Sequence, residues 1–136
     1  MKVKNGDVFV ALSEQDDGEG GKTKSPLKQL IDIGFPIKTS YLLAKMAHKL
    51  DSQFKIINEV KDGLIEKHGE KDEKSGSLSI QPTHKNWGKF IAEFNELLET
   101  EVELGVEKVK LPEKIGDKDI EVSTSILINL DKFIEV

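Results

Sequence analysis

Residues 16–23 read DDGEGGKT and contain the residue types that bind phosphate in nucleotide hydrolases. In those proteins the pattern G-x-x-x-x-G-K-[ST] joins a strand to a helix, and its backbone N–H groups surround the phosphates. Here Asp16 stands in place of the first glycine, and further carboxylates beside it would repel an anion. The next helix also starts too late, because Ser25 and Pro26 are typical of an N-cap and a first helical position. We therefore predict an acidic surface loop over residues 13–24.

The three histidines, His48, His68 and His84, are the other residues that could bind a metal or transfer protons. They lie too far apart for a local metal motif, and acidic residues two positions from His68 do not share one helix face with it. No serine or threonine lies in a nucleophile elbow, and the absence of cysteine excludes thiol chemistry. We therefore predict no catalytic, cofactor-binding or metal-binding residue, with a small enzyme or nucleotide-binding protein as an alternative.

The composition limits the partners that we expect. All 20 basic residues are lysine, whereas arginine is the usual residue for bidentate recognition of phosphate and guanine. The net charge is −5, and lysines alternate with acidic residues, so the sequence predicts no basic face for nucleic acid. No apolar run is long enough to span a membrane, and the amino terminus lacks a signal-peptide pattern. At 136 residues, we expect one soluble domain without membrane or nucleic-acid contacts.

Residues 37–68 carry the strongest structural pattern, because their apolar positions alternate at spacings of four and three, as in a heptad seam. Without a proline, this segment predicts a helix roughly 45 Å long, longer than a compact domain of this size is wide. Lys61 occupies a seam position where an apolar residue is expected, so either the seam shifts there or the partner helix ends. The seam positions are Leu43, Ala47, Leu50, Phe54, Ile57, Lys61, Leu64 and His68.

A second helix, opened by Pro82 and Thr83, is the natural partner, since its apolar residues repeat at four, three and four. An antiparallel hairpin of the two helices, over residues 35–100, leaves roughly 15 to 20 Å of the longer helix uncovered. A short helix predicted at residues 25–33, a small sheet or another subunit would have to cover it. The hairpin seam is thus the candidate interface: Leu43, Ala47, Leu50, Phe54, Ile57, Leu64, Trp87, Ile91, Phe94 and Leu98. For Trp87, core packing and an exposed partner anchor are both open.

Strands are predicted at the two ends of the chain. The apolar run at residues 8–12 predicts a buried strand, and a period of two begins at Glu101. Ile120 and Val122 fit another short strand, while residues 125–133 fit a helix as well as a strand. We therefore predict a single α+β domain over residues 1–136. It comprises a long antiparallel helical hairpin and a small antiparallel sheet, formed by the N-terminal strand and the C-terminal third.

Residues 35–111 resemble a group of short proteins encoded by tailed phages and prophages, of the helical-hairpin type. The resemblance rests on FPIKTSY at 35–41, LIEKHGEKDE at 64–73 and FNELLETEVEL at 94–104, with a terminal FIE at 133–135. The first 34 residues lie outside the pattern. No active site comes with the resemblance, which concerns the order of segments rather than a catalytic signature.

The resemblance implies a non-enzymatic phage protein that acts through protein–protein contacts in the host cytoplasm or the virion. We favour a virion or assembly component that binds itself or a phage structural protein, because the long helix needs more partner surface than the chain supplies. The alternative is a soluble accessory factor that binds and inhibits a host protein, with an acidic surface that imitates nucleic acid.

Overall fold

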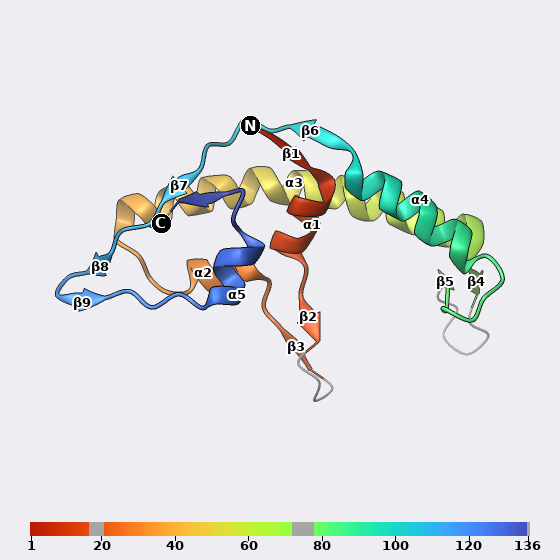
Figure 1. The fold of residues 1–136 in the computed structure, drawn as a ribbon, viewed down its shortest axis with the longest axis horizontal. Helices are drawn as coiled ribbons and strands as arrows, with labels where there is room; N and C mark the ends of the chain where they lie inside the picture. The colour runs from red at the N-terminus through yellow and green to blue at the C-terminus, as the bar shows by residue number, and fades with distance from the viewer. Residues whose placement is uncertain (17–20, 72–77, 136) are drawn as a thin grey trace.

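A computed structural model of the protein describes residues 1–16, 21–71 and 78–135. Its longest element is helix α3, Ile37–His68, which extends across the whole molecule while the other elements pack along it (Figure 1). Its 32 residues correspond to about 48 Å at 1.5 Å per residue. The long helix predicted from the heptad pattern is confirmed with the same bounds.

Helix α4, Trp87–Glu99, lies beside the C-terminal part of α3 (Figure 1). Phe90 is its buried residue, and the Glu93 carboxylate reaches His68 at the end of α3. The predicted start at Pro82 is wrong, because residues 82–86 form turns and the helix begins only at Trp87. The second helix is therefore shorter than its sequence pattern indicated.

Residues 5–12 form helix α1, Asn5–Leu12, so the prediction of a buried strand at residues 8–12 is wrong. Val8 and Ala11 have no exposed surface, and Phe9 and Leu12 pack against the same core. Helix α1 contacts α2, α3 and α4, which bury it from several sides. A short apolar run fits a helix in such a place as well as a strand, since periodicity cannot separate the two.

Helix α2, Pro26–Ile31, lies close to its predicted position. The Ser25 Oγ accepts a hydrogen bond from the Lys28 N–H at 3.3 Å, which caps the first turn as the sequence indicated. Gly34, with φ of 83°, adopts the left-handed conformation that favours glycine after a helix. Local chemistry thus sets both ends of this helix.

The strands form five separate two-stranded pairs within the described residues, so the prediction of one antiparallel sheet is wrong. Each strand is only two or three residues long, because the helices and not a sheet provide the layers of the core. Four pairs are antiparallel and the fifth, β7 with β10, is parallel. The pairs are β1 (Lys2–Lys4) with β6 (Glu101–Glu103), β2 (Gln15–Asp16) with β3 (Lys22–Thr23), β4 (Glu70–Lys71) with β5 (Leu78–Ser79), β7 (Val109–Lys110) with β10 (Ile134–Glu135), and β8 (Lys114–Ile115) with β9 (Lys118–Asp119).

The C-terminal segment resolves the ambiguity between helix and strand. Its first part forms helix α5, Thr124–Asn129, and a turn then leads to β10. Ile120 and Val122 do not form the predicted strand, and their half-buried side chains pack on the core instead.

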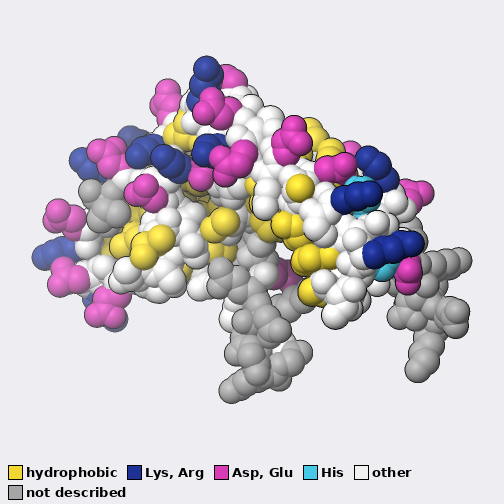
Figure 2. Space-filling view, turned by 45° about the vertical axis from the view of Figure 1, so that its right-hand side comes forward, with side chains coloured by type: hydrophobic (Ala, Val, Ile, Leu, Met, Phe, Trp, Pro, Cys, Tyr) yellow, Lys and Arg dark blue, Asp and Glu magenta, His cyan; other side chains and the backbone are white. Residues whose placement is uncertain are grey.

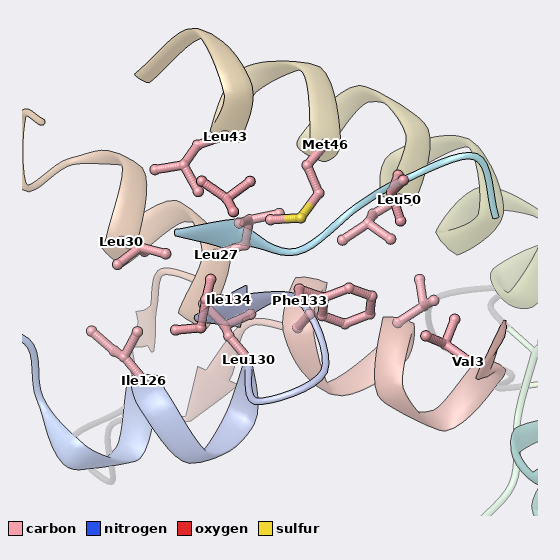
Figure 3. Packing of buried hydrophobic residues seen from close by; sticks show 14 of the residues in the cluster. Val3, Leu27, Leu30, Leu43, Met46, Leu50, Ile126, Leu130, Phe133 and Ile134 are labelled. Atoms are coloured by element: carbon pink, nitrogen blue, oxygen red, sulfur yellow. The ribbon is translucent and has the colours of Figure 1, made fainter. Parts of the chain in front are cut away.

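The core lies between the N-terminal half of α3 and the C-terminal segment (Figure 3). Leu43, Met46 and Leu50 face Phe133 and Ile134, and side chains of α2 and α5 close the same cluster. The stretch of α3 that α4 leaves uncovered is therefore covered by the chain itself, through its short helix and the β7–β10 pair.

Candidate functional site

The structure brings the predicted seam residues into the interior of the chain. Leu43, Leu50 and Ile57 have no exposed surface, so they belong to the core and are not available to a partner. The other residues of the predicted interface are half-buried: Ala47, Phe54, Leu64, Trp87, Ile91, Phe94 and Leu98. A surface for partners must therefore be sought on other faces of α3.

The seam continues through Lys61, because this side chain packs against aromatic rings. Its Nζ lies 5.7 Å from the ring centroid of Phe9 and 5.9 Å from that of Phe94, which are distances of cation–π contacts. The two rings meet edge to face at 5.6 Å, and the ring of Phe54 on α3 also lies 5.9 Å from that of Phe9. Helix α1 thus inserts an aromatic ring between α3 and α4.

Asn5 at the start of α1 ties both long helices together. Only 3% of this residue is exposed. Its Nδ2 donates to the Leu97 carbonyl at 3.0 Å, and its Oδ1 accepts from Gln53 Nε2 at 2.9 Å. Because a buried amide whose nitrogen and oxygen both have partners favours one arrangement of those partners, Asn5 fixes how α1, α3 and α4 sit together.

Two histidines lie where α3 and α4 meet β4 and β5. The Nε2 of His68 is 3.1 Å from Glu93, and the Nε2 of His84 is 3.0 Å from Glu70. His84 Nδ1 accepts from the Asn86 N–H at 3.0 Å, so its Nε2 carries the proton that is shared with Glu70. Within the described residues no group of three or more acidic or histidine side chains could hold a metal ion. The two pairs are therefore ion-pair or hydrogen-bond contacts that close this end of the molecule.

The pKa of Glu93 lies below its usual range, because His68 first and Lys67 second donate hydrogen bonds to the charged carboxylate. A carboxyl group with a lowered pKa in the folded state adds stability above its unfolded pKa, and that stability is lost as the pH falls through the folded pKa. Glu93→Gln is therefore expected to destabilise the protein near about pH 5, and its difference from the unchanged protein should shrink toward about pH 3. Urea unfolding at several pH values measures this.

The matched control for that substitution is Glu96→Gln, an exposed residue on the same helix. Its effect on stability should stay small and vary little across the same pH interval. A Glu93→Gln effect that is constant from about pH 5 to about pH 3 would contradict the role of the His68 and Lys67 contacts.

A shallow cavity of about 270 Å³ between α2 and α3 is lined by Ser25, His48 and Asp51, among others. These residue types form the catalytic triad of many hydrolases, in which hydrogen bonds join the three side chains. Here Ser25 Oγ accepts the capping bond of α2, and no hydrogen bond joins the three side chains in the described part of the chain. The arrangement lacks the contacts that activate a nucleophile.

The loop at residues 13–24 follows a helix, whereas a phosphate-binding loop follows a strand. Strands β2 and β3 pair across it, and residues 17–20 lie outside the described residues. The next helix begins at Pro26, and Lys24 forms an ion pair with Asp32 at 2.5 Å. In the described residues around this segment, helix α1 is followed by the β2–β3 pair and then by helix α2, which differs from the strand–loop–helix order of a nucleotide site.

The exposed large apolar side chains gather on α3. Ile37 is 86% exposed and Tyr41 is 63% exposed, one helical turn apart near the start of the helix. Ile56 and Val60 form a second such pair further along. In the described part of the chain, the exposed large apolar residues are Val10, Ile37, Tyr41, Leu42, Ile56, Val60 and Ile128, and five of these seven belong to α3.

These residues were missed because the sequence reasoning followed the seam alone. The sequence of the helix alone nonetheless indicates them, because apolar residues that lie outside the buried stripe of an amphipathic helix must face another surface. A helical projection of residues 37–68 would have separated Ile56 and Val60 from the seam.

A groove of about 570 Å³ lies between α3 and the chain that connects β6 to β7. Helix α3 contributes Leu42, Lys45, Met46 and Lys49 to one wall, and residues 103–109 form the other wall. The groove is the larger of the two cavities described here, and it adjoins the exposed side chain of Leu42.

The charged side chains do not form a single-sign surface on the face shown in Figure 2, where lysines lie among acidic residues. Hydrophobic atoms reach the same face in several separate groups.

None of the helices in the described ranges combines the length and the apolar composition that crossing a bilayer requires. The comparisons with models of protein families, with curated proteins and with solved structures each gave no match for this chain.

Proposed function

We propose that this chain is a phage-type, non-enzymatic protein that acts through protein–protein contacts in the host cytoplasm or the virion. Its role is that of an assembly component that associates with further copies of itself through the outer face of α3. The observation that carries this proposal is the concentration of exposed large apolar side chains on α3. Apolar groups that stay exposed in the folded chain are characteristic of surfaces that bind other proteins.

In this proposal α3 and α4 work as one rigid antiparallel hairpin that presents Ile56 and Val60 to a second copy. The contacts of His68 with Glu93 and of Asn5 with Gln53 and Leu97 support such a hairpin. The first joins the end of α3 to the middle of α4, and the second ties α1 to both helices near the C-terminal end of α4. Two copies related by a two-fold axis would place the same helical patch on each other, as in most homodimers.

The test is the molar mass in solution of the unchanged protein and of the double variant Ile56→Glu with Val60→Glu. Light scattering and sedimentation should show a mass that rises with concentration for the unchanged protein. Two carboxylates at the centre of the contact should weaken association at least about tenfold, equivalent to about 1.4 kcal/mol. Because both positions are exposed in the single chain, folding should be little affected.

The matched control is Ala44→Glu with Ser52→Glu, which adds the same charge at two other exposed positions of α3. This variant should associate like the unchanged protein. An unchanged protein that remains monomeric at all concentrations would refute self-assembly and would favour the accessory factor that binds and inhibits a host protein.

A further inference from the structure

The chain between β6 and β7 carries backbone groups without partners. Leu104 donates to the Met1 carbonyl at 2.9 Å and Val109 donates to the Phe133 carbonyl at 2.9 Å. Between them, the N–H and C=O groups of Val106, Glu107 and Lys108 make no hydrogen bond with any described residue. Unpaired backbone groups in succession are a template on which another strand can pair.

The same three residues line the groove whose opposite wall is α3. Its volume of about 570 Å³ lies within the usual range for ligand pockets, and Leu42 and Met46 give its floor an apolar part. An extended peptide placed here would lie between a helix and a chain segment whose backbone groups have no partner among the described residues. It could therefore satisfy backbone groups on one side and place side chains against α3 on the other.

The charges of the groove favour an acidic occupant. Lys45 and Lys108 form no ion pair with any described residue, and the Lys49 Nζ donates only to the Gly105 carbonyl. Of the two glutamates in the lining, Glu103 is already paired with the amino group of Met1 at 2.6 Å. Three lysines thus face one uncompensated carboxylate, that of Glu107.

We propose that this groove binds an extended, acidic segment of a partner protein, which pairs with the backbone of residues 106–108. Strand addition to a free edge is a recurrent mode of peptide recognition, in which backbone hydrogen bonds give affinity and alternate side chains give specificity. Carboxylates of the segment contact Lys45 and Lys108, and its alternate apolar residues contact Leu42. The site is separate from the Ile56 and Val60 patch, so the inference goes beyond the proposed self-association.

The probe is a fluorescein-labelled octapeptide of alternating glutamate and valine, with binding measured by fluorescence anisotropy. We expect saturable binding that Lys45→Glu with Lys108→Glu weakens at least about tenfold. The control variant, Lys89→Glu with Lys132→Glu, makes the same charge change at two exposed lysines outside the groove lining and should change the affinity less than about twofold. Circular dichroism verifies that both variants are folded.

Two further peptides test the strand pairing and the charge. The same octapeptide with methylated backbone nitrogens should bind at least about tenfold more weakly, because it cannot donate to the free edge. An octapeptide with lysine in place of glutamate should also bind more weakly. In hydrogen exchange, the glutamate peptide should slow alternate amides of this segment, those of Val106 and Lys108 or that of Glu107, because successive N–H groups of an extended chain point to opposite sides.

The inference is overturned if the glutamate peptide shows no saturable binding, or if both double variants weaken it equally. It is also overturned if backbone methylation leaves the affinity unchanged. The variant Ile56→Glu with Val60→Glu separates the two proposals, since it should lose self-association and retain the peptide. If the unchanged protein proved to be monomeric, the self-association proposal would fail, but the peptide-binding measurement would still test the groove.

Discussion

Leu50→Asp is expected to remove cooperative folding at neutral pH or to lower the free energy of unfolding by several kcal/mol. Leu50 has no exposed surface and lies in the middle of the core formed by α3 and the C-terminal segment. A carboxylate placed there has no partner and is costly to bury. Since whole domains of this kind are stable by about 5 to 15 kcal/mol, such a loss is a large part of the total. Urea unfolding followed by circular dichroism measures it.

Two controls define the cause of that loss. Leu50→Ala leaves a cavity without a charge and should cost about 2 to 5 kcal/mol. Ser52→Asp adds the same carboxylate at an exposed position of α3 and should change stability by less than about 0.5 kcal/mol. If Leu50→Asp unfolded at the same urea concentration as the unchanged protein, the packing of α3 against the C-terminal segment would be refuted.

Phe133→Ala is expected to lower the free energy of unfolding by about 3 to 5 kcal/mol. Phe133 is the largest of the fully buried side chains in the described residues. Its ring points toward Leu50 and Val3 (Figure 3). Removing the ring takes away apolar contact and leaves a cavity that the rigid helix α3 cannot fill. Urea or thermal unfolding of the purified variant gives the measurement.

The control for Phe133 is Ile128→Ala in the preceding helix, where the side chain is 68% exposed. That variant should differ from the unchanged protein by less than about 0.5 kcal/mol. Similar small effects for both substitutions would mean that the segment after α5 is not part of the core.

The helices that could be predicted from the sequence are those fixed by local signals. Helix α3 repeats its apolar residues from Leu43 to Leu64, over about six turns, and α2 has a serine cap, a first-turn proline and a closing glycine. Helix α1 lacked such a signal, because it is short and its run of apolar residues at positions 8–12 shows no polar face, even where Val10 is exposed. Its helical conformation therefore depends on packing against α2, α3 and α4.

Two of the five strand pairs could not be predicted because their partners are far apart in sequence. Strand β7 pairs with β10 in parallel, and β1 pairs with β6. Two-residue strands carry too little pattern to indicate a register, which elsewhere follows from alternating apolar residues. The groove beside α3 has the same origin, since its walls come from two segments that only the fold brings together.

Lys61 interrupts the apolar pattern of the α3 seam, but its side chain still packs at that seam position. The seam predicted either a shift or an end at this position, yet its ammonium group lies over the rings of Phe9 and Phe94. The long apolar stem of lysine can pack like a core residue while its charge finds an aromatic face. The ring of Phe9 could not be anticipated there, because α1 was predicted as a strand.

The pairing of β1 with β6 has a consequence for synthesis on the ribosome. Lys2 pairs with Glu103, so the first strand cannot find its partner until about 100 further residues have been made. At about 5 to 20 residues per second this delay is roughly 5 to 20 s, whereas a helix forms within about a microsecond. The nascent chain therefore holds α3 well before its amino-terminal strand can dock, and Val3 of β1, which is buried in the folded chain, stays without its partner strand during that time as surface that a chaperone can recognise.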